Sequence, residues 1–184
     1  MPSPLGHALA GIAAGWVLDP APAGGGRRAA RRTAIFALAA TIPDLDLLIG
    51  THRGPSHSLA ASLAAGIVAW AWYAWVLRRG GGAGPSDARA ASRAPLRLAL
   101  PVAAAYATHV LLDWLGADSS APIGLMALWP LSHDYYSTSR PVFFAISRRY
   151  WLADFWGLNL RAVAREVLWL GPLAVLAWRV RGRK

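Results

Sequence analysis

Residues 58–77, SLAASLAAGIVAWAWYAWVL, restrict the fold of this chain most, because they form a run of twenty residues without a charge. An α-helix of about 20 apolar residues crosses the ~30 Å hydrocarbon core of a bilayer. Within lipid every backbone N–H and C=O must be bonded internally, which a helix achieves along its own length. We therefore expect an all-α membrane protein. The alternative is that this run forms a buried helix of a soluble bundle.

Four weaker apolar segments accompany this run. They are shorter or carry His and Asp, yet each is apolar enough to insert as part of a bundle, and they cover residues 5–18, 33–50, 98–116 and 167–180. The composition agrees, with 55% hydrophobic residues, 15% charged residues and a mean hydropathy of +0.34. We expect one domain, residues 1–184, folded as an integral membrane bundle of about four to five transmembrane or re-entrant helices.

The start of the chain, MPSPLGHALAGIAAGWVLDP, has the length of a signal peptide. It has no basic region before its apolar run, and His7 lies within that run, so we expect a retained first helix. The chain contains no cysteine, so a metal ion must be bound by His, Asp, Glu or backbone oxygen.

Positive charge is concentrated in three clusters at the ends of apolar segments. The formal net charge is +10, and the clusters are RRAARR (27–32), RRGGGAGPSDARAASRAPLR (78–97) and RVRGRK (179–184). This placement follows the positive-inside rule of membrane proteins, so it disfavours a nucleic-acid partner as the reason for the charge. We expect a bacterial inner-membrane protein with a flexible cytoplasmic loop over residues 80–94.

Taking the three basic clusters as cytoplasmic sets the direction of each segment. The first segment then runs inward, residues 33–50 run outward, 58–77 run inward and 98–116 run outward, and the last segment returns to the basic tail. Seven polar residues from distant parts of the chain fall at or near the outward end, and inverting the topology keeps them together. They are His7, Asp44, Asp46, His52, His57, His109 and Asp113.

Two stretches fit this topology less directly. Residues 139–165 carry five arginines among aromatic residues, and we expect an interfacial amphipathic segment there. Residues 119–132 have a re-entrant character. His133 and Asp134 follow them and either join the site or lie in a loop.

His109 and Asp113 are four residues apart in THVLLDW. On a helix this spacing places both side chains on one face, close enough to hold one cation between them. The alternative is a pair that hides its charges from lipid. His7 is likewise either a ligand or a packed residue near the start of the first helix.

Asp44 and Asp46 follow Pro43 at a spacing of two, which would direct them to different sides of a regular helix. Both reach one site if the backbone leaves helical geometry there, if they serve two metals, or if one of them orients a ligand. A carboxylate at a bilayer centre costs ~2.5–3.5 kcal/mol, which disfavours a stray acid. The alternative is a turn at the water interface.

The stretch THRGPSHS forms a polar turn between two apolar segments, because Gly and Pro interrupt regular structure. Its imidazoles, His52 and His57, suit a divalent first-row metal. Arg53 could bind an anionic oxygen such as that of phosphate. The alternative is a plain interfacial loop.

The motifs GHALAG, IPDLDLL, HRGPSHS and HVLLDWLG running into IGLMALWPLS occur in this order over nearly the whole chain. Together they resemble the YdjM-type membrane-bound metal-dependent hydrolases. The resemblance implies that the seven polar residues named above form a metal site, and the naming of one family member implies association with the LexA repressor. The chain departs from many relatives at Ser56, where they have Thr, and in the longer segment DWLGADSSAPIG.

A more distant similarity is to the zinc-dependent phospholipase C and single-strand nuclease superfamily. Its helical enzymes draw their zinc ligands from an early His, an Asp, a His and a later HxxxD, and the order here is similar. The second HxxxD of that superfamily is absent from the sequence, as is a clear counterpart of its N-terminal ligand. This departure favours one or two metals over three.

We expect a divalent metal ion, first zinc and otherwise manganese or iron, that activates water against a phosphoester or lipid-like substrate. One of Asp44 and Asp46 would act as general base or orient a ligand, and Arg53 would stabilise developing negative charge. Membrane lipids are the expected partners. The alternatives are a non-catalytic membrane protein with a structural metal or polar network, and a membrane partner of a repressor of the LexA type.

Overall fold

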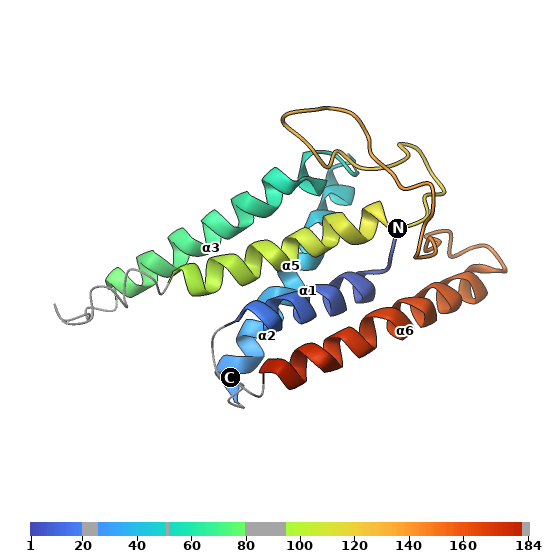
Figure 1. Cartoon of the computed structure of the whole chain (residues 1–184). Helices are drawn as coiled ribbons and strands as arrows, with labels where there is room; N and C mark the ends of the chain where they lie inside the picture. The colour runs from blue at the N-terminus through green and yellow to red at the C-terminus, as the bar shows by residue number, and fades with distance from the viewer. Residues whose placement is uncertain (20–25, 51, 80–94, 182–184) are drawn as a thin grey trace.

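The computed structural model describes residues 1–19, 26–50, 52–79 and 95–181, so the loop predicted over 80–94 lies outside the described residues. The described part is all-α, as predicted, with two short 3₁₀ helices between the second and third α-helices (Figure 1). Its elements are α1 (Pro4–Leu18), α2 (Arg27–Thr41), η1 (Ile42–Ile49), η2 (Pro55–His57), α3 (Leu59–Arg79), α5 (Leu96–Trp114) and α6 (Phe155–Arg181).

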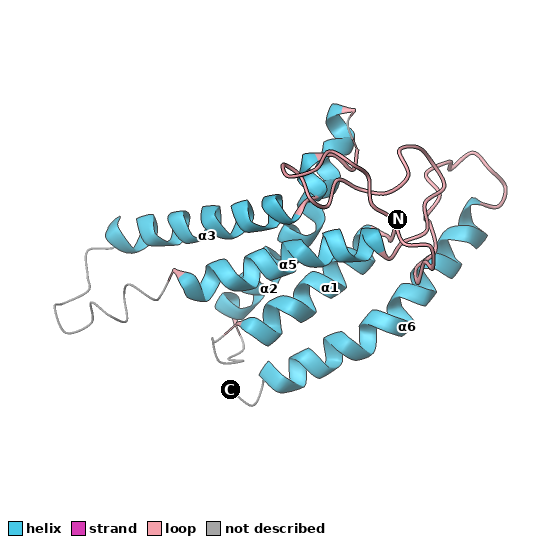
Figure 2. Ribbon diagram, turned by 45° about the horizontal axis from the view of Figure 1, so that its top comes forward, coloured by secondary structure: helices cyan, strands magenta, loops and turns pink. Residues whose placement is uncertain are grey.

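Helix α1 lies at the centre of the bundle, where it packs against α2, α5 and α6, while α3 packs against α5 (Figure 2). The close approach depends on small residues in α1. A Cβ on Gly11 would lie 2.3 Å from the Cβ of Ala40, and one on Gly15 would lie 2.3 Å from the ring of Phe36. Small residues at helix contacts allow backbones to approach closely, which drives helix association in membranes.

Helices α3 and α5 are long and apolar enough to cross a membrane, by length and composition. They agree with the spans predicted over 58–77 and 98–116. Only 11% of the apolar window of α3 is buried, against 56% for α5. A core helix of a soluble protein would be mostly buried, whereas Leu63 and Val68 of α3 are each 67% exposed. The apolar surface of α3 therefore favours contact with lipid over the soluble-bundle alternative.

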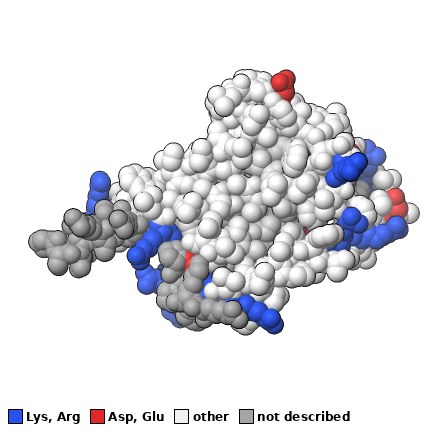
Figure 3. Space-filling model, viewed as in Figure 1, with Lys and Arg blue, Asp and Glu red and all other residues white. Residues whose placement is uncertain are grey.

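Charged side chains gather at the two ends of the bundle. Figure 3 shows Lys and Arg at both ends of the face it views, with a band between them that is largely free of charged residues. At one end α3 finishes with Arg78 and Arg79, and α6 finishes with Arg179 and Arg181 in its last turn. Charge at both ends and an apolar middle are typical of a bundle that crosses a bilayer.

Two predicted segments have different boundaries in the structure. Residues 33–50 do not form one helix, because α2 ends at Thr41 and the chain continues as the 3₁₀ helix η1, with Pro43 at its start. The last helix begins at Phe155 instead of 167, so the second half of the predicted interfacial segment 139–165 belongs to α6. The stretch 119–132, predicted to have re-entrant character, contains no helix.

Residues 115–154 form an irregular segment, here called the cap, over the end of the bundle where α5 finishes and α1 begins (Figure 2). Isolated bridges link Gly116 with Phe143 and Leu125 with Tyr136. The cap is also bonded to the loop before α3, since the Met126 N–H donates to the Arg53 carbonyl at 3.1 Å. It therefore covers the end that carries η1 and η2.

Candidate metal centre

Five side chains from four elements meet beneath the cap, and we call them the inner cluster: His7, Asp44, His57, His109 and Asp113. His57 Nε2 and His109 Nε2 each lie 3.4 Å from Asp113 Oδ2, and His7 Nε2 lies 3.3 Å from Asp113 Oδ1. Asp44 Oδ1 lies 3.8 Å from His57 Nε2 and 3.7 Å from His109 Nε2. The three imidazoles are fully buried.

Local structure explains how these residues converge. His109 and Asp113 lie one turn apart on α5, so the HxxxD spacing places them on one face as predicted. Asp44 and Asp46 lie in η1, where the chain has left α-helical geometry, which is the condition under which both were expected to reach one site. His7 comes from the first turns of α1, and its ring stacks on that of His109 with centroids 3.9 Å apart.

The inner cluster contains buried polar atoms without a hydrogen-bond partner. They are both ring nitrogens of His7, Asp44 Oδ1, His57 Nε2, His109 Nε2 and both carboxylate oxygens of Asp113. Leaving such groups unsatisfied costs ~1–3 kcal/mol each, and buried polar atoms in proteins nearly always have a partner, so this concentration calls for a ligand.

The spacing of these atoms fits a divalent cation. Zinc bonds to nitrogen and oxygen of ~2.0–2.2 Å at tetrahedral angles place neighbouring ligand atoms about 3.4 Å apart. The nitrogen–oxygen distances in the inner cluster are 3.3–3.8 Å. A donor set of imidazole and carboxylate without sulfur also suits manganese or iron. The residues present therefore fit the metal predicted from the sequence, without identifying it.

Hydrogen bonds on the far side of two imidazoles direct their Nε2 atoms inward. His109 Nδ1 lies 2.7 Å from the carbonyl oxygen of Ala40, which can only accept, so Nδ1 carries the proton. His57 Nδ1 lies 3.1 Å from Asp46 Oδ2. With Nδ1–H donating outward, the Nε2 of His109 presents its lone pair to the cluster, and the Nε2 of His57 would do so once a cation takes the place of its second proton, as in metal sites where a carboxylate or carbonyl orients the ligating histidine.

Asp46 lies outside the inner cluster and its two oxygens are occupied. Oδ1 is 2.8 Å from His52 Nδ1, while Oδ2 accepts from Ser56 Oγ at 2.7 Å and from the Arg53 N–H at 3.2 Å, besides its contact with His57. Burial raises the pKa of Asp46, but the hydrogen bonds from His52, His57 and Ser56 outweigh burial and lower the pKa below its ordinary value. Asp46 is thus placed to orient His57.

Burial lowers the pKa of His57, but its contacts with Asp44 and Asp46 outweigh burial and raise the pKa to about 9. Acids on both sides of the ring thus create a negative field that favours positive charge in its vicinity. His52 lies on the outer side of Asp46, with Nε2 2.7 Å from Met1 Sδ. His52 could hold an ion only together with Asp46 and His57, as a second group.

Arg53 does not direct its guanidinium to the inner cluster in any contact of the described residues. Its Nη2 forms an ion pair with Asp118 Oδ1 at 2.7 Å, and its Nη1 donates to the carbonyls of Ser120 at 3.2 Å and Pro122 at 2.5 Å. Asp118 Oδ2 in turn accepts from the N–H of Gly124 at 2.7 Å. These contacts join the loop that carries His57 to the cap, which differs from the charge-stabilising role expected for Arg53.

Sequence reasoning missed Glu166 of α6, which is fully buried. Its carboxylate accepts from the Ser3 N–H at 2.7 Å and from the Ser3 hydroxyl, and Ser3 Oγ caps α1 by accepting from the Gly6 N–H at 3.2 Å. A Cβ on Gly6 would lie 2.6 Å from Glu166 Oε2, so this approach requires glycine. The signal was a single acid at the start of the apolar run 167–180, beside Arg165, since ionisable residues in membrane helices mark a functional or structural partner.

His133 and Asp134 lie away from the inner cluster. Both are exposed, and Asp134 Oδ2 accepts from the Ser132 hydroxyl at 2.8 Å. Neither belongs to the groups of His and Asp that could hold an ion among the described residues. Of the two alternatives that the sequence left open for this pair, the structure places it in a loop.

Comparison with known proteins gave one match to a family. The family model described as YdjM inner membrane protein matches residues 1–183. No curated protein and no solved structure matches the chain. The matched residues include α1 to α6, the cap and the complete inner cluster.

Proposed function

The chain belongs to the YdjM inner membrane protein family, and we propose that it is a membrane-bound hydrolase that uses a divalent metal against a phosphoester or lipid-like substrate. The observation that carries the proposal is the convergence of His57, His109 and Asp113 through buried ligand atoms that have no hydrogen-bond partner. A purely structural polar network would satisfy these atoms within the protein. Their vacant bonding capacity supports a metal site instead.

In this proposal the five α-helices of the described residues form the membrane bundle. Helices α3 and α5 are the candidate spans. Helix α1 is shorter, but α2, α5 and α6 pack around it, so its length does not have to equal the thickness of the bilayer. The inner cluster then lies at one membrane face, beneath the cap. The basic clusters at the opposite end support an outward orientation of the cluster.

We assign His57, His109 and Asp113 as the residues that hold the ion. Catalytic zinc sites use three protein ligands and leave one position open. A divalent ion held by these residues would lower the pKa of water toward ~7 and so would supply hydroxide at neutral pH. His7 lies beside that carboxylate, with its Nε2 3.3 Å from Asp113 Oδ1.

Asp44 is the group we assign as general base. Its side chain is 16% exposed, against 2% for Asp113, so it lies on the more open side of the cluster. Its Oδ1 is free of hydrogen bonds and can accept a proton from the attacking water. Asp46 orients His57, and Arg53, held by Asp118, fastens the cap above the site.

The test begins with metal content. Protein purified in detergent without chelator is analysed by plasma mass spectrometry, together with the Asp113→Asn, Asp44→Asn and Asp134→Asn variants. We expect bound divalent metal in the wild type and its loss in Asp113→Asn. Asp44→Asn should retain metal but lose hydrolysis of bis(4-nitrophenyl) phosphate by roughly 10²-fold or more, the lower range for general base catalysis. Asp134→Asn, altered on the exposed cap, should behave as wild type.

Three results would contradict parts of this proposal. A wild type that neither retains nor takes up metal would refute the metal site. Bound metal without hydrolysis of any phosphoester or lipid would favour the structural-metal alternative. Full activity of Asp44→Asn would refute its role as general base while leaving the metal site intact.

A further inference from the structure

An apolar groove lies on the lipid-facing side of α2, α3 and α5, and we call it the α2–α3–α5 groove. Its volume is about 390 Å³. Alanines from α2 and α3, among them Ala39, Ala65 and Ala69, line it together with larger side chains such as Val68 and Trp72. Small residues opposite large ones leave a trough in the surface of the apolar band.

One end of this groove adjoins the candidate metal centre. Ile42 lines the groove and begins η1, two residues before Asp44. Tyr106 also lines it, lies one turn before His109 on α5, and donates its hydroxyl to the carbonyl of Ser56 at 2.8 Å. Through this hydrogen bond, Tyr106 connects the groove directly to the loop that carries His57.

The surroundings of the groove indicate what occupies it. Val68 and Trp72 are 67% and 52% exposed, and both belong to α3, whose apolar window is only 11% buried. On a membrane helix such a surface contacts hydrocarbon, and an apolar trough there takes an acyl chain. A chain in this groove would place its own polar head at the end where the inner cluster lies.

We propose that the α2–α3–α5 groove holds an acyl chain of a membrane phospholipid and delivers its phosphoester to the inner cluster. This inference rests on the proposed hydrolase function and narrows its substrate class. The preferred substrate is then a phospholipid whose hydrocarbon chain is bound in the groove, and not a soluble phosphoester. Val68 and Trp72 then determine how well the chain is held.

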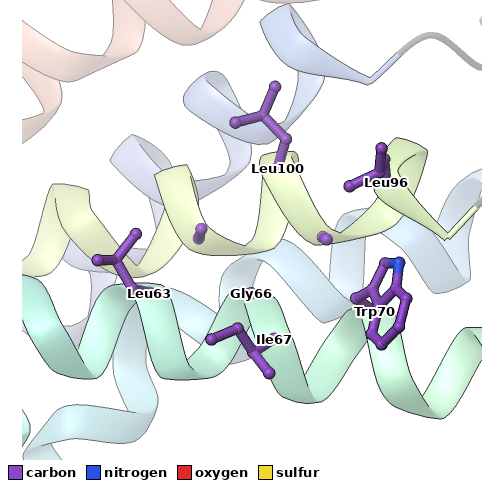
Figure 4. A pocket seen from close by; sticks show the side chains of 8 residues that line it. Leu63, Gly66, Ile67, Trp70, Leu96 and Leu100 are labelled. Carbon is purple, nitrogen blue, oxygen red and sulfur yellow. The ribbon is translucent and has the colours of Figure 1, made fainter. Parts of the chain in front are cut away.

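A second groove between α3 and α5 provides the internal control. Figure 4 shows Leu63, Ile67 and Trp70 on α3 and Leu96 and Leu100 on the neighbouring α5, which line a volume of about 360 Å³. Its lining includes no residue of η1, and its lining on α5 stops at Ala103, short of Tyr106. It is also apolar, yet it shares neither Ile42 nor Tyr106, the two residues that connect the α2–α3–α5 groove to η1 and to the loop of His57.

The experiment compares Val68→Trp with Ile67→Trp. The two positions are adjacent on α3 and 67% and 65% exposed, so both variants should fold, but each fills a different groove. Native mass spectrometry in detergent measures retention of dioleoyl phosphatidylethanolamine. Parallel assays measure hydrolysis of the same lipid in mixed micelles and of bis(4-nitrophenyl) phosphate, which has no acyl chain.

Val68→Trp should lower lipid retention and lipid hydrolysis roughly tenfold or more, the scale on which an apolar pocket discriminates by one methylene. Its hydrolysis of the soluble diester should equal that of wild type, and Ile67→Trp should match wild type in all three assays. Equal lipid retention by the two variants would overturn the groove proposal while leaving metal-dependent hydrolysis of the diester untouched. If wild type hydrolyses neither substrate, the hydrolase proposal fails, and lipid retention alone decides whether the groove binds a chain.

Discussion

Asp44 and Asp46 are two residues apart in the sequence and lie on opposite sides of one imidazole. Asp44 Oδ1 faces His57 Nε2 at 3.8 Å, and Asp46 Oδ2 faces His57 Nδ1 at 3.1 Å. The two acids differ in their free bonding capacity, since both oxygens of Asp46 already accept hydrogen bonds and Asp44 Oδ1 accepts none. We therefore expect their substitutions to have separable effects.

The Asp46→Asn variant tests the orienting role. The carboxamide keeps the shape of the side chain but weakens its hold on the Nδ1–H of His57, so zinc affinity should fall ~10–100-fold, as for other groups that orient ligating histidines. Isothermal titration calorimetry with zinc gives the measurement, with Asp134→Asn as control. An affinity equal to that of wild type would exclude the orienting role, and a complete loss of binding, as expected for Asp113→Asn, would make Asp46 a direct ligand.

At the scale of the element, the position of α1 depends on a contact with a distant helix. Glu166 of α6 bonds to Ser3, which caps α1, and His7 follows in the first turns of that helix. The carboxylate also lies at the N-terminus of α1, where negative charge is favourable. We therefore expect Glu166 to affect the inner cluster through the placement of α1.

Replacing Glu166 should disturb metal binding without touching a ligand. We expect Glu166→Ala to weaken zinc affinity by roughly tenfold or less, which is a smaller effect than that of Asp46→Asn. Among the described residues, Glu166 bonds to no member of the inner cluster directly and influences it only through the first turn of α1. Glu166→Gln should recover most of the affinity, since its amide oxygen still accepts from the Ser3 N–H. Calorimetry and thermal unfolding in detergent are measured together.

Leu170→Ala is the matched control for Glu166→Ala. Leu170 lies one turn further along α6 and is 6% exposed, so its truncation should lower the melting temperature through lost packing but leave zinc affinity unchanged. If both variants weaken zinc binding equally, Glu166 acts only through the general stability of the bundle.

For the whole molecule, the two ends of the bundle should face opposite sides of the membrane. The chain has no cysteine, so a single introduced thiol reports its own location. Ser137 in the cap and Ala30 near the start of α2 are both exposed. With the basic clusters inside, an impermeant maleimide should label Ser137→Cys in intact spheroplasts and Ala30→Cys only after permeabilisation.

Each other labelling pattern has a distinct meaning. If Ala30→Cys were labelled in intact spheroplasts and Ser137→Cys only after permeabilisation, the topology would be inverted and the inner cluster would lie on the cytoplasmic side. Labelling of both positions in intact spheroplasts would contradict a membrane-crossing bundle with its ends on opposite sides.

Several features could be predicted because they depend on local pattern. The apolar run at 58–77 determined α3 by its length alone, and the spacing of His109 and Asp113 determined that they share a face of α5. The change to a 3₁₀ helix at Ile42 was not predicted outright. Departure from helical geometry was named only as one condition under which Asp44 and Asp46 could reach the same site. The early start of α6 was missed, since its first turns carry arginines that resembled an interfacial segment.

The sequence by itself determined that this chain is a helical membrane protein and that its scarce histidines and acids gather at one end, because apolar length and charge placement act along the chain. Only the tertiary structure decided that Asp44 lies in the inner cluster while Asp46 contacts the outer nitrogen of His57, that Arg53 binds Asp118, and that Glu166 bonds to Ser3 at the start of α1. These roles depend on which hydrogen-bond partners remain free after packing, and those partners come from residues far apart in the sequence.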